Sequence, residues 1–142
     1  KHFHIPALIL GAGITPRLDE RIISQIDLPV TLLCLAGVSC VHPMIGQDLT
    51  SQTPNRAMMQ YDNRYGYLKN DQLLVLDPHM QPQQFTCLAS DKFQPSRPDE
   101  ALAQEALAHA LSPHNVYTNN SYKTPAAHTF LQETEVFSPI HP

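Results

Sequence analysis

The sequence has no tryptophan, little charge and only three cysteines. Charged residues make up 15% of its 142 residues, and the net charge is −4. This balance excludes a strongly basic surface for nucleic acid. The cysteines form no Cys-x-x-Cys pair, and their odd number leaves at least one thiol without an intrachain partner. No apolar run approaches the ~20 residues that cross a bilayer, and no secretory signal is present in these residues.

Proline, in contrast, is abundant, with 13 residues spread along the chain. This spacing predicts short elements joined by rigid turns. The length suits one domain that buries roughly two-thirds of the surface of its unfolded form. The sequence starts at Lys1, without methionine, directly before an apolar run. We therefore expect the C-terminal piece of a longer protein.

The first part of the chain predicts one strand and one helix. Ile5 to Leu10 is apolar without alternation, which is typical of a strand covered on both faces. Asp27 to Ala36 predicts a helix with Asp27 as the N-cap and Gly37 just past its end. Because its body is apolar nearly all round, we expect more than one neighbour to bury this helix.

From Arg56 onward, short runs predict an antiparallel sheet. The runs are AMMQYD, YGYLK, QLLVLD and QFTCL, with a hairpin turn at Asn70-Asp71. A second helix is predicted from Pro98 to Leu111, with Ser96 as its cap and Pro113 as its stop. The predicted fold class is α/β. We expect residues 1–50 to belong to an α/β core, residues 51–116 to form a small antiparallel subdomain with its closing helix, and residues 117–142 to form an irregular tail.

The stretch LILGAG does not predict a nucleotide site. A dinucleotide fingerprint needs a third glycine three residues after the second, at the start of a helix. Here Pro16 occupies that position, and no helical stripe follows. We interpret Gly11 and Gly13 as a tight exit from a strand.

His2 and His4 are the candidate substrate-binding residues. Alternation places both on the same side of an extended chain, where they could share a metal or an anion. No Asp, Glu or Cys lies close by in the sequence, so no complete metal site can be drawn. Either histidine could instead line a cleft or pack at a sheet edge. We assign no catalytic residue and no metal ligand within this chain.

The sequence also gives little support for a catalytic nucleophile. Ser24, Ser39 and Thr31 lie in no Gly-x-Ser-x-Gly elbow, and Asp27 fits an N-cap better than a general base. A polar aromatic surface is one interpretation of five residues in the sheet, and cross-strand packing is the other. These five are Arg56, Tyr61, Arg64, Tyr65 and Tyr67.

Four motifs carry a family resemblance that covers about Phe3 to Leu111. They are HIPALILGAGI, ISQIDLPVTLLCLAGV, HPMIGQDL and NRAMMQYD. In this order they resemble the C-terminal part of sulfatase-like members of the alkaline phosphatase superfamily, closest to lipoteichoic-acid-synthase-type phosphoglycerol transferases. The family helix S-Q-x-D-x-x-P-T-L-L-x-L-x-G is matched from Ser24 to Gly37, except that Val30 stands where many members have proline. The match of HPMIGQDL is to the family loop Pro-x-x-Gly-x-Ser/Asp-Leu.

The resemblance implies the C-terminal portion of an alkaline-phosphatase-like sandwich. It implies a transferase or hydrolase acting on phosphoesters of membrane lipid or cell-envelope glycan. A divalent cation (manganese, magnesium, calcium or zinc) would activate the nucleophile. In the family the nucleophile and metal ligands lie upstream, so we expect this segment alone to be inactive, with His2 and His4 near the active-site end of the sheet. The expected location of the whole protein is the extracytoplasmic face of the bacterial membrane.

The expected partners are the rest of the catalytic domain and, through the N-terminal strand, a second copy. Two rival hypotheses remain open. One is a stand-alone module that binds glycan or lipid headgroups through the tyrosine-rich sheet. The other is a small metal-dependent enzyme built on His2 and His4.

Overall fold

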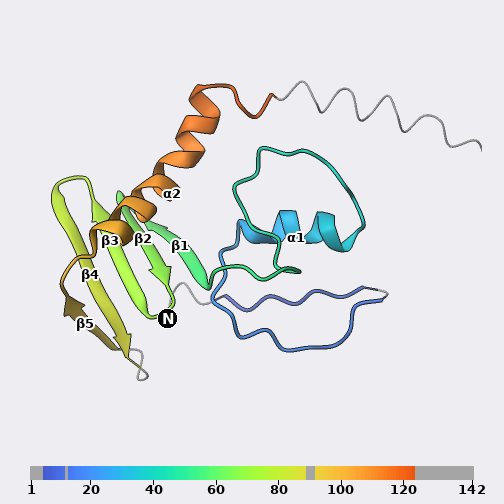
Figure 1. Ribbon diagram of the computed structural model, residues 1–142, viewed down its shortest axis with the longest axis horizontal. Helices are drawn as coiled ribbons and strands as arrows, with labels where there is room; N and C mark the ends of the chain where they lie inside the picture. Colours follow the sequence, from blue (N-terminus) through green and yellow to red (C-terminus); the bar gives the residue numbers. More distant parts are fainter. Residues whose placement is uncertain (1–4, 12, 89–91, 124–142) are drawn as a thin grey trace, which may run out of the picture.

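The computed structural model describes residues 5–11, 13–88 and 92–123. These residues form an α/β arrangement of two helices and one five-stranded antiparallel sheet (Figure 1). The elements in chain order are α1 (Asp27–Leu35), β1 (Arg56–Tyr61), β2 (Arg64–Lys69), β3 (Gln72–Asp77), β4 (Met80–Leu88), β5 (Lys92–Ser96) and α2 (Glu100–Thr118).

The sheet is a meander in which each strand pairs with the next along the chain. The predicted hairpin at Asn70-Asp71 is confirmed, since it joins β2 to β3. Asn70 adopts φ 54°, a left-handed conformation that asparagine tolerates without glycine. Strand β5 has no counterpart among the predicted elements. Its sequence, KFQPS, contains Pro95, which a strand tolerates at a sheet edge.

Helix α2 packs across β2 and β3 and forms the core with them. The fully buried apolar side chains there are Tyr67, Leu74 and Ala106. Because side chains alternate along a strand, Tyr67 and Leu74 define the sheet face that α2 covers. The opposite face receives neither described helix, because α1 lies beside the sheet (Figure 1).

The predicted limits of the second helix were wrong at both ends. Its N-cap is Asp99, whose carboxylate accepts hydrogen bonds from the backbone N–H of Ala101 (2.8 Å) and Leu102 (3.3 Å), rather than Ser96. The helix also continues through Pro113 to Thr118. Proline removes only one backbone donor, and the flanking turns remain hydrogen-bonded, so the residue does not end the helix.

The N-terminal region differs most from expectation. Residues Ile5 to Leu10 form no strand, and Leu8 and Leu10 are 82% and 83% exposed. A strand needs a neighbour to take its backbone hydrogen bonds, and no strand of the described residues lies beside this segment. The expected core strand is therefore absent from the described chain.

Helix α1 is present as predicted but is not buried by several neighbours. Only Asp27 and Thr31 are buried, while Leu32 and Leu35 are 50% and 43% exposed. Gly37 follows the helix with φ 70°, as its sequence position predicts. The N-cap is Ile26, not Asp27. The carboxylate of Asp27 is instead turned toward a buried polar cluster.

Candidate functional site

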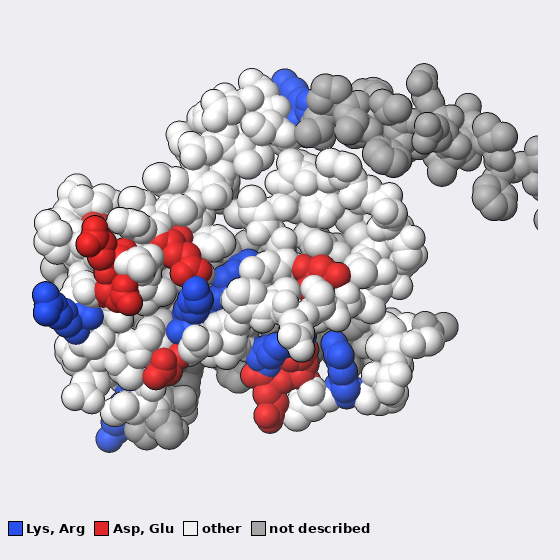
Figure 2. Space-filling model, in the orientation of Figure 1, with Lys and Arg blue, Asp and Glu red and all other residues white. Residues whose placement is uncertain are grey.

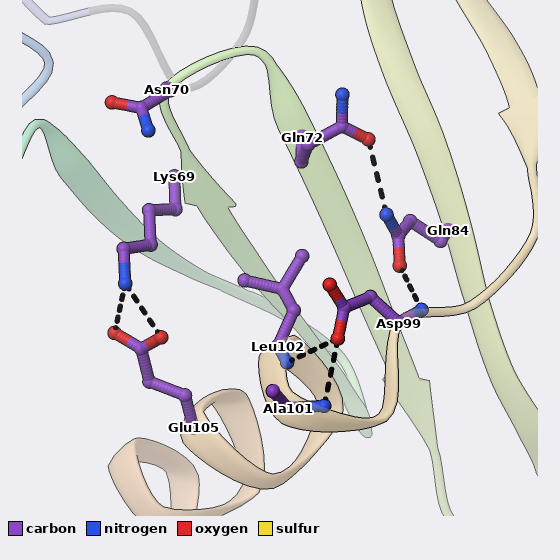
Figure 3. A pocket seen from close by; sticks show the side chains of 8 residues that line it. All are labelled: Lys69, Asn70, Gln72, Gln84, Asp99, Ala101, Leu102 and Glu105. Carbon is purple, nitrogen blue, oxygen red and sulfur yellow. Dashed lines mark hydrogen bonds and ion pairs between the residues drawn. The ribbon is translucent and has the colours of Figure 1, made fainter.

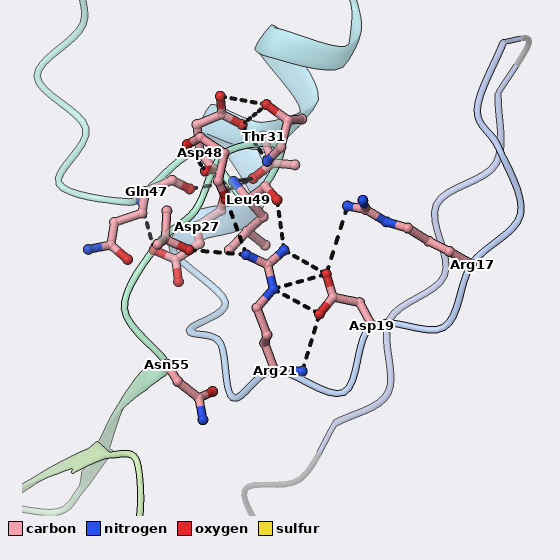
Figure 4. Close-up of polar contacts among 12 residues, drawn as sticks. Arg17, Asp19, Arg21, Asp27, Thr31, Gln47, Asp48, Leu49 and Asn55 are labelled. Atoms are coloured by element: carbon pink, nitrogen blue, oxygen red, sulfur yellow. Dashed lines mark hydrogen bonds and ion pairs between the residues drawn. The ribbon is translucent and has the colours of Figure 1, made fainter.

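Four polar side chains are buried where α1 meets the start of the sheet. We call Ser24, Asp27, Thr31 and Arg56 the Asp27 junction. Each is at most 3% exposed, which is unusual for such residues unless they are well paired. Figure 4 shows how α1 and the loop at Gln47 to Leu49 converge on this cluster.

Asp27 links three segments through its carboxylate. Oδ2 accepts a hydrogen bond from the backbone N–H of Ser24 (2.9 Å), and Oδ1 accepts one from the N–H of Gln47 (2.8 Å). The Nη2 atom of Arg56, the first residue of β1, lies 3.3 Å from the same Oδ1. One buried carboxylate thus joins the entry to α1, the following loop and the sheet.

The two hydroxyls of the junction also bond to the backbone. Thr31 Oγ1 donates to the Asp27 carbonyl (2.7 Å) and accepts from the N–H of Leu49 (3.0 Å). Ser24 Oγ accepts from the N–H of Met58 (2.7 Å) in β1. Gly46 allows the loop to approach, since a Cβ there would lie 2.0 Å from the Ile26 carbonyl oxygen.

These contacts make the junction a structural connector. A nucleophile or general base needs access to substrate, whereas Ser24, Asp27 and Thr31 are buried and bonded to backbone groups. Asp27 is therefore not the expected N-cap, and its burial does not suit the alternative of a general base. On Arg56, the buried Nε and Nη1 atoms have no hydrogen-bond partner among the described residues.

A second polar cluster lies between α2 and β2. Tyr67 donates a hydrogen bond from its hydroxyl to Glu105 Oε1 (2.8 Å), and Lys69 Nζ lies 2.7 Å from Oε2. The ring of Tyr67 stacks on His109, with centroids 5.2 Å apart. Burial and the Glu105 contact raise the pKa of the Tyr67 hydroxyl well above its usual value of 10.0. This tyrosine stays protonated across the physiological range.

The pKa values of the Glu105 carboxyl and the His109 imidazole in this cluster are also shifted. Burial raises the pKa of Glu105, but the hydrogen bonds from Lys69 and Tyr67 outweigh it and leave the pKa below its usual value. Burial, assisted by the charge of Arg56, lowers the pKa of His109. At neutral pH the cluster therefore pairs an ionised carboxylate with an ammonium and holds the imidazole neutral.

A small cavity of about 270 Å³ opens beside this cluster, between the β2–β3 turn and the first turn of α2 (Figure 3). Gln84 closes its inner side by donating to Gln72 Oε1 (3.1 Å) and accepting from the N–H of Asp99 (2.7 Å). Asp99 already caps the helix N-terminus. The side chains of Lys69, Glu105, Gln72, Gln84 and Asp99 thus already bond to one another or to the start of α2, and the cavity does not define a ligand.

A broader hollow lies between residues 17–21 and 49–53, with a volume of about 870 Å³. Arg21 and Arg17 both face Asp19 there, at 2.6 Å and 3.8 Å (Figure 4). The Arg21 contact lowers the pKa of Asp19 to about 2. Because the carboxylate offsets the guanidinium charges, this hollow is no strongly positive anion site. Acidic and basic side chains are interspersed on the face drawn in Figure 2.

The remaining predicted residues are not brought together. His2 and His4 lie outside the described residues, so their proposed substrate contacts stay predictions. His42 is half-buried, with no partner for Nδ1 in the described chain. Tyr67 is fully buried whereas Tyr61 is 73% exposed, so the tyrosines do not share one exposed surface.

The described residues do not fit a divalent cation. They contain no group of three or more His, Cys, Asp or Glu side chains that could hold a metal ion. They also include no helix long and apolar enough to span a membrane. Sequence reasoning named Arg56 only as part of a polar aromatic surface and missed Glu105. No local pattern predicts either contact, because Arg56 lies 29 residues from Asp27 and Glu105 lies 38 residues from Tyr67.

Comparison with solved structures finds a homologous protein. The chain matches a crystal structure of a Vibrio parahaemolyticus protein in the alkaline phosphatase superfamily, with 46% sequence identity and a TM-score of 0.80. The match covers 87% of this chain and 31% of the Vibrio chain. This protein is thus homologous to a segment of an alkaline phosphatase superfamily protein, and it spans about a third of that relative's length. No protein-family model matches the chain.

Proposed function

We propose that this chain is the C-terminal portion of a metal-dependent phosphotransferase or phosphohydrolase domain of the phosphoglycerol transferase type. The observation that carries the proposal is the 46% identity with a segment of an alkaline phosphatase superfamily protein, at a TM-score of 0.80. The order of the four sequence motifs favours the sulfatase-like branch. The substrates would be phosphoesters of membrane lipid or cell-envelope glycan, at the extracytoplasmic face of the membrane.

In this proposal the chain supports the active site instead of supplying its reacting groups. The nucleophile and the ligands of the divalent cation belong to residues outside this chain. The Asp27 junction holds α1 and its loop against the sheet, which gives a rigid unit that the remainder of the domain can pack on. His2 and His4 are placed by the proposal at the edge of the substrate cleft.

Fragment complementation tests the proposal. The chain is mixed with the Vibrio parahaemolyticus protein lacking its matching segment, and hydrolysis of bis(p-nitrophenyl) phosphate is measured with manganese. We expect turnover by the mixture and none by the chain alone. Metal-dependent turnover by the chain alone would overturn the assignment of the reacting groups to other residues. Faster turnover of an aryl sulfate than of the phosphodiester would instead identify a sulfatase.

A further inference from the structure

The sheet face opposite α2 is apolar across all five strands. One cross-strand row on this face contains only apolar side chains, and a second row contains three apolar or small residues and one glutamine. The first row is Ala57, Leu68, Leu73, Phe85 and Pro95, and the second is Met59, Gly66, Val75 and Gln83. We call these two rows the bare face.

Contacts confirm that the side chains of the bare face lie together. A Cβ added to Gly66 would meet Met59 and the Leu73 Cδ1 atom at 3.5 to 3.8 Å. The four aliphatic or aromatic residues in the middle of the sheet (Leu68, Leu73, Val75 and Phe85) are only half-buried. On the face that α2 covers, the side chains of Tyr67 and Leu74 are fully buried. The difference indicates that neighbouring strands alone shield the bare face.

Charge is confined to the rim of this face. Arg64 and Asp77 form an ion pair at 3.0 Å near the open ends of β2 and β3, and no Lys, Arg, Asp or Glu lies in either row. Five strands spaced ~4.8 Å apart, with two rows of side chains, present an area of a few hundred Å². The largest apolar patch of a typical monomeric protein has this size and is often a functional surface.

The comparison relates most of this sheet to part of a longer protein. The Vibrio match covers 87% of this chain, and the sheet from Arg56 to Ser96 is much longer than the part left out. Most of this sheet therefore has a counterpart in a relative of which about two thirds lies outside the match. Permanent interfaces are more apolar than transient ones and resemble a domain core cut in half, and the bare face has this apolar character.

We propose that the bare face is the docking surface for the remainder of the same catalytic domain, through an apolar surface of that remainder. This inference rests on the proposed function, because it takes the chain to be part of a longer superfamily domain. It adds that the interface lies on the sheet, in the rows that contain Leu73 and Val75, and not only at the N-terminal segment.

The test compares Val75→Lys with Met80→Lys. Met80 is a matched control, since it lies on the same sheet at the β3–β4 turn, is 54% exposed and belongs to neither row. Binding to the Vibrio protein that lacks its matching segment is measured by calorimetry, after circular dichroism confirms that each variant is folded. We expect at least a tenfold weaker binding for Val75→Lys and unchanged binding for Met80→Lys.

Other results separate the two proposals. Binding through the bare face without phosphodiester turnover would reject the proposed chemistry and leave the docking surface in place. Equal binding by both variants, with turnover, would overturn the docking surface alone. A wild-type dimer that Val75→Lys dissociates, with no binding to the Vibrio protein, would overturn it in favour of a second copy.

A second measurement covers variants that fail to fold. In the intact Vibrio parahaemolyticus protein, lysine is introduced at the positions aligned with Val75 and with Met80. We expect a lower Tm for the first variant and an unchanged Tm for the second. Equal Tm values for both variants and the wild-type protein would overturn the inference.

Discussion

Asp27 and Arg56 meet inside the molecule, with Oδ1 of the carboxylate 3.3 Å from Nη2 of the guanidinium and both side chains at most 2% exposed. The pair joins the first turn of α1 to the first residue of β1. Removing two charges from water is costly, and the cost is offset only when further hydrogen bonds satisfy them. Asp27 meets this condition through two backbone N–H donors.

Breaking this pair from one side should destabilise the chain strongly. Arg56→Met leaves a buried carboxylate with only its backbone partners, and Asp27→Asn leaves a buried guanidinium without a counter-charge. We expect each variant to lower the free energy of unfolding by about 3–5 kcal/mol. Urea denaturation followed by circular dichroism measures the loss.

The exposed pair of Asp19 and Arg21 provides the matched control. Its N–O distance is shorter, 2.6 Å, but its side chains are 37% and 29% exposed. Solvent screens such pairs, so Asp19→Asn should cost no more than about 1 kcal/mol. Equal losses at both pairs would contradict the structural role assigned to the junction.

Gly46 should tolerate no side chain. A Cβ at this position would lie 2.0 Å from the backbone oxygen of Ile26, and backbone atoms cannot move aside as a flexible side chain can. We expect Gly46→Ala to lower the free energy of unfolding by about 1–3 kcal/mol. Hydrogen exchange at the Gln47 amide, which donates to Asp27, should accelerate.

Gly37 separates this steric effect from backbone strain. Its φ is 70°, but no atom lies within 4 Å of an added Cβ. Gly37→Ala should therefore cost only about 1 kcal/mol, the usual penalty of a left-handed alanine. A larger loss for Gly37→Ala than for Gly46→Ala would contradict the close approach of loop and helix.

The sequence predicted those elements whose signals are local. The hairpin at Asn70, the helix from Asp27 and the glycine after it follow from turn and capping preferences. The expected strand at Ile5 to Leu10 failed because a strand forms only beside a partner, and hydrophobicity alone does not supply one. Asp27 was misread for a similar reason: an aspartate before a helix matches a cap locally, whereas its actual partner, Arg56, lies 29 residues away.

The chain should become less stable below neutral pH because His109 takes up a proton more readily in the unfolded state. Its folded-state pKa lies below the usual 6.5, first through burial and then through Arg56. Glu105, Lys69 and Asp27 are further charged neighbours, and the ring of Tyr67 stacks on it from β2. Because the unfolded state binds the proton more readily, the contribution of His109 is complete above pH 6.5 and is lost as pH falls toward the folded value.

His109→Phe isolates this contribution, because it keeps an aromatic ring stacked on Tyr67 and removes the titrating group. We expect a similar Tm at pH 7.5 and a smaller fall in Tm between pH 7.5 and pH 5 than in the wild-type chain. The range stays above the usual Glu105 pKa of 4.5, so that carboxyl contributes little. A pH dependence unchanged by the substitution would assign the effect to other histidines.

Pro113 offers a stabilising substitution. It lies inside α2, where proline costs ~3 kcal/mol relative to alanine because it lacks a backbone donor and crowds the preceding turn. The surrounding half of the helix is exposed, with Leu107 and Leu111 at 49% and 47%, so tertiary packing adds little to it. Pro113→Ala should raise helical circular dichroism and slow hydrogen exchange from His114 to Thr118. Its effect on the global Tm should be smaller, because α2 contributes to the core at Ala106, about two turns before Pro113. Faster exchange in the variant would show that the proline supports the last turns.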